Sequence, residues 1–268
     1  MDRQVFERFR EIVQREAGIS LGAEKHTLLA NRISKRLMKL GVSSEREYLE
    51  IIESDLEGPE LLQLIDAIST NVTYFWREQA HFEFLAQDLN QRRMEGREIK
   101  IWCAASSSGE EPFCLAAVAH RWLQQPGTRA KVRILATDIS TKVLGVANLA
   151  LYDPKQLRDT PAEFARRYFP VKNVDGESRV VVDEALREMV AFRKLNLSKF
   201  PFPLKGDLDY IFCRNVMIYF DKELRQQIIS EFTRLLRPQG VLVISHSENL
   251  MGISQTLKSV QPGVYRKC

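Results

Sequence analysis

The sequence has few cysteines and histidines, and neither residue type forms a pattern that indicates a disulfide framework or a metal site. Its 268 residues include 4 cysteines and 4 histidines. No cysteines are spaced as CxxC, and the histidines form no HExxH motif. Cys103, Cys114 and Cys213 lie in apolar runs that are typical of a protein core. This usage predicts reduced thiols and no bound metal.

Long hydrophobic runs and a strong charge of one sign are also missing. No stretch of about 18 apolar residues is present to cross a bilayer, and the N-terminal region lacks the apolar segment of a secretory signal. The net charge is +4, which is too weak by itself to indicate a nucleic-acid partner. These absences predict a cytoplasmic protein, whose length allows one or two domains at about 150 residues each.

Glycine-rich phosphate-binding signatures are missing where they would be expected. Residues 99–115 read IKIWCAASSSGEEPFCL, an apolar strand, a small-residue loop and the start of an apolar helix. The loop has neither GxGxxG nor GK[ST], and Glu110 and Glu111 would repel phosphate. Carboxylates suit a ligand with cationic and hydroxyl groups, such as S-adenosylmethionine (SAM). An ordinary strand–turn–helix connection with solvated glutamates is the alternative.

Helical periodicity occupies the N-terminal quarter of the chain, before any strand-like run. Apolar spacing predicts helices over 5–16, 25–40, from 43 or 44 to 52, and 61–68. We therefore expect a small all-α domain over 1–70. Residues 71–81 are polar, β-branched and aromatic without a clear period, and we expect a linker that contributes to the active site. The remaining residues, 82–268, are predicted to form an α/β domain.

Strands and helices alternate through this second domain. Strands are expected near 99–102 and over 132–137, 189–195, 208–213, 241–245 and 263–266. This alternation predicts a Rossmann-like, mainly parallel sheet with helices on both faces. Asp175-Gly176 between β-prone residues predicts a small antiparallel insertion at about 169–188. Asp138 ends the second strand. An acidic residue at this position either accepts hydrogen bonds from ribose hydroxyls or caps a helix.

Several segments together resemble one protein family. They are NVTYFWRE (71–78), WCAASSSGEEPF (102–113), ATDIS (136–140), NL (196–197) and IFCRNVMIYFD (211–221). In this order they resemble the CheR-type glutamate methyltransferases that modify bacterial chemoreceptors, and the pair GEEP and CRNVMIYF is specific. Small departures are Ser108, where Thr is common, and Phe113, where Tyr is common.

The resemblance implies that the chain transfers the SAM methyl group to the γ-carboxylate of receptor glutamates for sensory adaptation, leaving S-adenosylhomocysteine. The implied partner is the cytoplasmic helical domain of chemoreceptors. The implied catalytic residues are Arg77 and Tyr219, and the implied SAM contacts are Asn71, Thr73, Arg77, Glu111, Asp138, Asn196, Leu197, Arg214 and Asn215. Whether the β insertion docks a receptor C-terminal tether peptide stays open.

The residue types suit this chemistry. A glutamate carboxylate has a pKa of about 4.3 and needs no general base at neutral pH, which agrees with the absence of a His–Asp or Cys–His arrangement. Arg77 offers a forked set of donors that matches a carboxylate. Each assignment has a plain alternative: a surface arginine for Arg77, a packed aromatic for Tyr219, and loop hydrogen bonding for Asn196, Arg214 and Asn215.

The helix expected over 25–40 has an apolar side and a basic side. Leu29, Ile33, Leu37 and Leu40 share one side; Lys25, Arg32, Lys35, Arg36 and Lys39 gather on the adjoining one. No acidic residue follows at i+4 to neutralise the basic side. We expect it, through Arg32, Arg36 and Lys39, to dock an acidic receptor helix. A solvated charged surface is the alternative.

Two other functions compete with receptor methylation. A nucleic-acid methyltransferase would agree with the basic helix, but amino-group methylation of a base usually calls for an NPPY-like loop where this chain has CRNV, and no patch alternates basic and aromatic residues. A receptor-binding module without catalysis is disfavoured because every implied SAM position holds a suitable residue.

Overall fold

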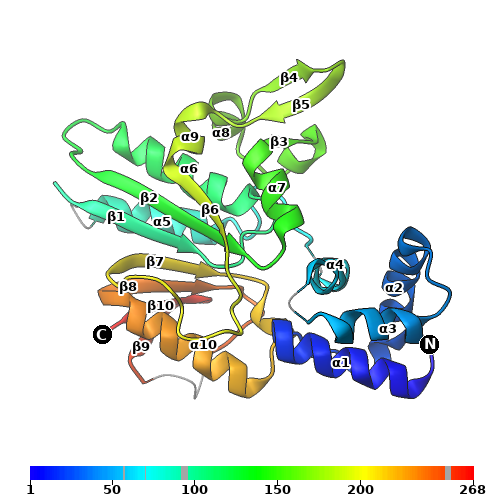
Figure 1. Cartoon of the computed structure of the whole chain (residues 1–268). Coiled ribbons are helices and arrows are strands. Elements are labelled where there is room, and N and C mark those ends of the chain that lie inside the picture. Colours follow the sequence, from blue (N-terminus) through cyan, green and yellow to red (C-terminus); the bar gives the residue numbers. More distant parts are fainter. Residues whose placement is uncertain (57, 70, 92–95, 251–254) are drawn as a thin grey trace.

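The structure is a computed structural model that describes residues 1–56, 58–69, 71–91, 96–250 and 255–268. Residue 70, at the predicted domain boundary, lies outside the described residues. Figure 1 shows a group of N-terminal helices beside a larger part built on a twisted sheet. Within the described ranges, no helix combines the length and the apolar composition needed to span a bilayer.

The N-terminal part is a bundle of amphipathic helices, as the periodicity predicts. Its helices are α1 Arg3–Ala17, the 3₁₀ turn η1 Ala23–Lys25, α2 His26–Leu40, α3 Glu45–Ser54 and α4 Pro59–Ile68. The Asp2 side chain caps α1 by accepting a hydrogen bond from Val5 N. Phe9, Ile12 and Tyr48 are completely buried between the helices. This bundle therefore has a hydrophobic core of its own.

The larger part is organised on a main sheet whose strand order is β6-β2-β1-β7-β8-β10-β9. The strands are β1 Glu98–Cys103, β2 Lys131–Asp138, β6 Val190–Lys194, β7 Leu208–Cys213, β8 Leu236–Ile244, β9 Leu257–Gln261 and β10 Val264–Lys267. Strands β6, β2, β1, β7 and β8 run parallel, and β10 and β9 add antiparallel pairs. The predicted Rossmann-like sheet is confirmed. Strand β9 was missed because most of its side chains are exposed and show no alternation.

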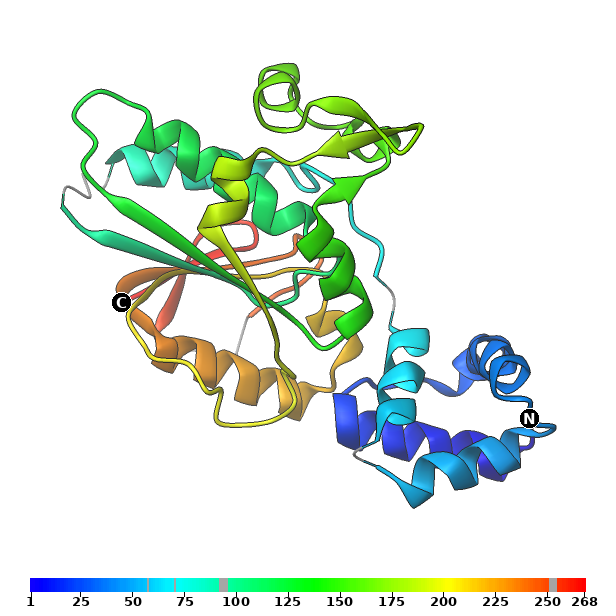
Figure 2. The same ribbon diagram turned by 45° about the horizontal axis from the view of Figure 1, so that its top comes forward.

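Helices cover both faces of this sheet, also as predicted (Figures 1 and 2). They are α5 Ala80–Gln91, α6 Glu110–Leu123, α7 Thr141–Leu149, α8 Ala162–Tyr168, α9 Glu184–Met189 and α10 Lys222–Leu235, with the 3₁₀ turns η2 Pro154–Leu157 and η3 Met217–Tyr219. Helices α5, α6, α7 and α9 share one apolar cluster with the sheet. Helix α10 packs on the opposite face, where Phe232 meets Trp102 edge-on.

The predicted β insertion is a separate small sheet of order β3-β5-β4. Strands β4 Val171–Val174 and β5 Glu177–Val181 form the hairpin, with Asp175 and Gly176 at its turn. Strand β3 Leu151–Tyr152 was not predicted, because two residues are too short to produce a periodic pattern. In Figure 1 this sheet projects from the main sheet at a distance from the N-terminal helices.

The end of α1 packs against the start of α10 and the loop after β6. Asn196 Nδ2 donates to the carbonyl oxygen of Glu16 over 2.6 Å, and Ser20 N donates to the carbonyl oxygen of Tyr219 over 2.8 Å. Gly18 ends α1 with a φ of 71°, and a Cβ there would lie 2.9 Å from Ser198 Cβ. Glycine is therefore required for both the turn and the close approach.

Replacing Gly18 by alanine should lower the free energy of unfolding more than the same change at Gly41. Gly41 also ends a helix, with a φ of 67°, but a Cβ there meets nothing within 4 Å. Both variants should lose about 1–2 kcal/mol from the left-handed backbone, and Gly18→Ala a further ~1–3 kcal/mol from the clash. Urea unfolding measures both losses. Equal losses would contradict a tight contact between the two parts of the chain.

Candidate functional site

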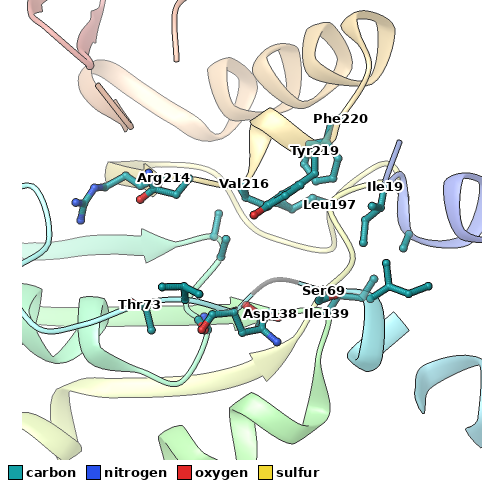
Figure 3. Close-up of a pocket in the computed structure, with 18 of the residues that line it drawn as sticks. Ile19, Ser69, Thr73, Asp138, Ile139, Leu197, Arg214, Val216, Tyr219 and Phe220 are labelled. Carbon is teal, nitrogen blue, oxygen red and sulfur yellow. Dashed lines mark hydrogen bonds between the residues drawn. The ribbon is translucent and has the colours of Figure 1, made fainter. Parts of the chain in front are cut away.

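A cavity opens at the C-terminal ends of β1, β2 and β7, where the N-terminal helices meet the sheet (Figure 3). Every residue predicted from the sequence to hold the cofactor or act in catalysis lines it. They are Asn71, Thr73, Arg77, Glu111, Asp138, Asn196, Leu197, Arg214, Asn215 and Tyr219. They come from segments far apart in the sequence, because parallel strands bring the loops at their carboxyl ends together at one edge.

Asp138 lies at the end of β2 and is only 9% exposed. Its Oδ2 accepts a hydrogen bond from Ser107 N over 2.9 Å, and its Oδ1 accepts one from Ser140 N over 3.0 Å. Burial raises the pKa of this carboxyl, although these backbone bonds oppose the rise. A carboxylate has further lone pairs after two bonds, so Asp138 can still accept hydrogen bonds from a ligand.

The neighbouring glutamates at the start of α6 have different roles. Glu111 lines the cavity and accepts hydrogen bonds from Arg214 Nη1 over 2.7 Å and Cys103 Sγ over 3.2 Å. Glu110 is fully buried and accepts bonds from Ser108 Oγ and Gln156 Nε2. Burial raises the pKa of Glu110. The alternative of solvated glutamates is therefore wrong for Glu110, and only Glu111 offers its carboxylate to the cavity.

Arg77 lies in the segment that connects α4 to α5. Its Nη1 donates to the carbonyl oxygen of Val72 over 2.7 Å, and its guanidinium lies 6.0 Å from the centroid of the Tyr74 ring. Among the described residues, no carboxylate forms an ion pair with Arg77. Its remaining donors are therefore available to a ligand.

Tyr219 ends the 3₁₀ turn that follows β7. Its backbone oxygen accepts the hydrogen bond from Ser20 N, and its ring extends into the cavity (Figure 3). Within the part of the chain that the structure describes, its hydroxyl has no hydrogen-bond partner. The ring also packs against the apolar cluster on this face of the sheet, so the packing alternative describes the ring and the hydroxyl is the part that faces the cavity.

Other predicted residues use their side chains within the protein. Asn196 Oδ1 accepts hydrogen bonds from Ser198 N and Oγ, in addition to the Asn196 bond to Glu16. Arg214 is 4% exposed and donates to Glu111 and to the carbonyl oxygen of Arg77. For Asn196, the side chain therefore forms the loop hydrogen bonds that were the alternative to SAM binding. These residues shape the cavity wall.

The N-terminal helices complete the cavity, which no sequence pattern predicted. Ala17, Ile19, Ser20, Leu21, Lys25, Leu28, Ile68 and Ser69 form this side of the lining. The sheet side adds apolar surface from Ile139, Val216 and Phe220. The nearest sequence signal is the glycine that ends α1, because it frees the chain to turn back into the site.

Outside the lining, Glu78, His81 and His246 lie together, with ligand atoms within 4.8 Å of one another. His81 and His246 are far apart in the sequence, but the fold brings their ring centroids to 4.5 Å from each other. Burial, and then the charge of Arg214, lowers the pKa of His81 to about 3, so this imidazole is neutral at neutral pH. Arg214 Nη2 lies 3.7 Å from Glu78 Oε2.

The basic side of α2 also needs correction. Arg36 forms an ion pair with Glu60 of α4, with Nε 2.9 Å from Oε1, and is only 12% exposed. It is therefore not a free charge for docking, because a helical wheel omits partners from other helices. Leu40, assigned to the apolar side, is 42% exposed. Lys35 and Lys39 are exposed, and Arg32 is half-buried.

Two family models cover almost the whole chain. "CheR methyltransferase, all-alpha domain" matches residues 4–69, and "CheR methyltransferase, SAM binding domain" matches residues 71–265.

The curated relatives agree with these models. The chemotaxis protein methyltransferase of Borreliella burgdorferi is 37% identical, with 97% of this chain and 93% of the relative covered. Chemotaxis protein methyltransferase 2 of Pseudomonas aeruginosa is 38% identical, with 98% and 92% covered. The Escherichia coli chemotaxis protein methyltransferase is 38% identical, with 91% and 84% covered. The chain therefore belongs to the CheR family and is a SAM-dependent methyltransferase.

Proposed function

We propose that the protein methylates the γ-carboxylate of specific glutamates in bacterial chemoreceptors, producing glutamate methyl esters and S-adenosylhomocysteine for sensory adaptation. The observation that carries this proposal is that one cavity holds both the Arg77 guanidinium and the Tyr219 hydroxyl. Among the described residues, the guanidinium has no carboxylate partner and the hydroxyl has no hydrogen-bond partner. A guanidinium fork matches a carboxylate, and the curated relatives are chemotaxis protein methyltransferases. The protein would act in the cytoplasm, on the helical domain of the receptors.

The donors and acceptors of the cavity fit SAM. Asp138 would accept hydrogen bonds from the ribose hydroxyls, and Glu111 would face the positively charged part of the ligand. Ile139, Leu197 and Val216 offer an apolar surface to the adenine. The rest of the proposed binding set is Asn71, Thr73, Arg77, Asn196, Arg214 and Asn215. When bound, SAM supplies a methyl group on a positively charged sulfur.

The residues of the chain then have to orient a carboxylate and keep water away. The incoming glutamate is already ionised at neutral pH, so no group has to remove a proton. Arg77 would bind and orient its carboxylate, and the Tyr219 hydroxyl would sit beside the methyl transfer. Orientation of this kind can contribute about 7–11 kcal/mol.

Receptor docking is proposed for the part of the basic side of α2 that forms no ion pair with the described residues. Lys25 and Leu28 line the cavity, so the start of α2 lies at the site itself. Arg32 and Lys39 extend from there along the helix, and Arg36 is excluded by its ion pair. For a receptor tether peptide, β4 offers an edge of the small sheet that pairs only with β5 among the described strands.

Transfer of label from methyl-labelled SAM to receptor membranes, released as methanol by base, tests the proposal directly. Base-labile label identifies a carboxyl methyl ester. Label that appears only on nucleic acid, or on no acceptor, would overturn the proposed function.

Replacing Asp138 by alanine should weaken binding of both SAM and S-adenosylhomocysteine. A lost hydrogen bond to a charged group is worth roughly 1.5–3 kcal/mol, or about 10- to 150-fold in affinity. Calorimetry measures the change. Asp153→Ala is the matched control, because Asp153 is exposed and caps η2 outside the cavity. Unchanged affinity in Asp138→Ala would contradict the assignment of Asp138 to the ribose hydroxyls.

Tyr219→Phe should reduce turnover about 10- to 100-fold while SAM affinity stays nearly the same, because we assign the hydroxyl to the transition state. Initial rates on receptor membranes and calorimetry separate these quantities. Tyr265→Phe, on β10 outside the lining, serves as the control. A full initial rate in Tyr219→Phe would show that Tyr219 is a packing residue.

Reversing Arg32 and Lys39 together to glutamate should raise the apparent KM for receptor about tenfold at low salt and flatten its salt dependence. SAM affinity should stay unchanged. The control reverses Arg129 and Lys131, which are exposed near the opposite end of β2 from the cavity. If the Arg32 and Lys39 variant methylates receptor normally across a salt series, the docking proposal is contradicted and this surface is only a solvated one.

A further inference from the structure

Both neighbours of Arg77 adopt a backbone conformation that is unusual for residues with side chains. Trp76 has a φ of 66° and Glu78 a φ of 56°. Such left-handed residues cost about 1–2 kcal/mol each and persist only where the surroundings hold them. Trp76 is held by burial against Phe82 and Phe164. Glu78 is polar, so its side-chain contacts must supply the restraint.

The carboxylate of Glu78 gathers donors from two loops. Oε1 accepts hydrogen bonds from Asn215 Nδ2 over 3.0 Å and from Ser245 Oγ over 2.8 Å. Oε2 accepts one from His246 N over 3.2 Å and lies 3.7 Å from Arg214 Nη2. These partners follow β7 and β8, whereas Glu78 precedes α5. One carboxylate therefore joins three segments at the carboxyl end of the sheet.

The same carboxylate is connected to Arg77 through a buried guanidinium. Arg214 Nη2 donates to the carbonyl oxygen of Arg77, and Arg214 Nη1 donates to Glu111. Glu78 itself does not line the cavity. It lies behind the wall, and its charge, with that of Glu111, neutralises a guanidinium that water does not reach.

The ionisation of Glu78 agrees with this arrangement. Burial by itself would raise its pKa, but the charge of Arg214 and the hydrogen bonds from Asn215 and Ser245 outweigh burial and lower the pKa to about 2. The carboxylate is therefore charged at any pH at which the enzyme works.

We infer that Glu78 is a positioning residue for methyl transfer: by holding Arg214 and the loops after β7 and β8, it fixes the backbone of Arg77 and so aims the Arg77 guanidinium into the cavity. The inference rests on the catalytic role proposed for Arg77. It assigns Glu78 no contact with SAM or with the receptor glutamate.

A metal ion is the competing explanation for this cluster, because Glu78, His81 and His246 are types that bind zinc. The structure favours the positioning role. The Arg214 guanidinium already faces the Glu78 carboxylate, and a divalent cation there would be repelled by it.

A double-mutant cycle between Glu78 and Arg77 tests the inference. Glu78→Gln keeps the shape of the side chain and removes its charge. We expect receptor methylation by Glu78→Gln to fall about tenfold or more, and Glu78→Gln to have little further effect when Arg77 is already alanine. Glu83→Gln, on the exposed face of α5, is the matched control and should keep the normal rate.

Ser245→Ala is a milder second variant in case Glu78→Gln does not fold. It removes one donor to Glu78 and leaves the Arg214 contact in place. The expected loss is about threefold, again absent in the Arg77→Ala background. A thermal melt of each variant identifies those that are folded.

The outcomes separate this inference from the proposed function. Independent, multiplying effects of Glu78→Gln and Arg77→Ala would overturn positioning through Arg77 and leave the proposed function standing. A normal rate in Arg77→Ala would overturn the catalytic role of Arg77 and the positioning inference with it. If a chelator abolishes the activity of the wild type and Zn²⁺ restores it, the cluster is a metal site and the positioning inference is overturned.

Discussion

The buried guanidinium of Arg214 is the charge on which the cavity depends. Removing it from water is costly unless opposite charges and hydrogen-bond acceptors compensate. Its Nη1 and Nη2 find these partners in Glu111 at the start of α6, Glu78 before α5 and the backbone of Arg77, while its Nε has no hydrogen-bond partner among the described residues. Pairing this one charge brings together the loop after β7, helix α6 and the segment that leaves the N-terminal helices. This side of the cavity wall follows from that requirement.

The second constraint is the contact between the two parts of the chain. The sheet offers only an open edge of loops, and the cavity is closed by residues around the ends of α1 and α4 and the start of α2. Gly18 allows α1 to approach the loop after β6, and Asn196 fixes the approach by binding the last turn of α1. The ligand site therefore lies between two hydrophobic cores, a common location for a binding site.

Local patterns predicted the elements that a period of 2 or 3.6 residues can encode. The strand–loop–helix unit around Trp102, the position of Asp138 and the hairpin at Asp175 followed from short-range rules and are present in the structure. The misses occurred where short-range rules have no information. Strand β3 is two residues long, β9 is mostly exposed, and Arg36 is neutralised by Glu60 from another helix.

The sequence by itself determined the class of the fold, the all-α and α/β division, and the candidate residues that line the cavity from the sheet side, because these depend on periodicity and on motifs within a few residues. Only the tertiary structure decided which of two adjacent glutamates, Glu110 or Glu111, faces the cavity, and that Glu78 joins three loops behind it. Burial and long-range pairing set these outcomes. Both arise from residues more than thirty positions apart, so no local pattern in the chain encodes them.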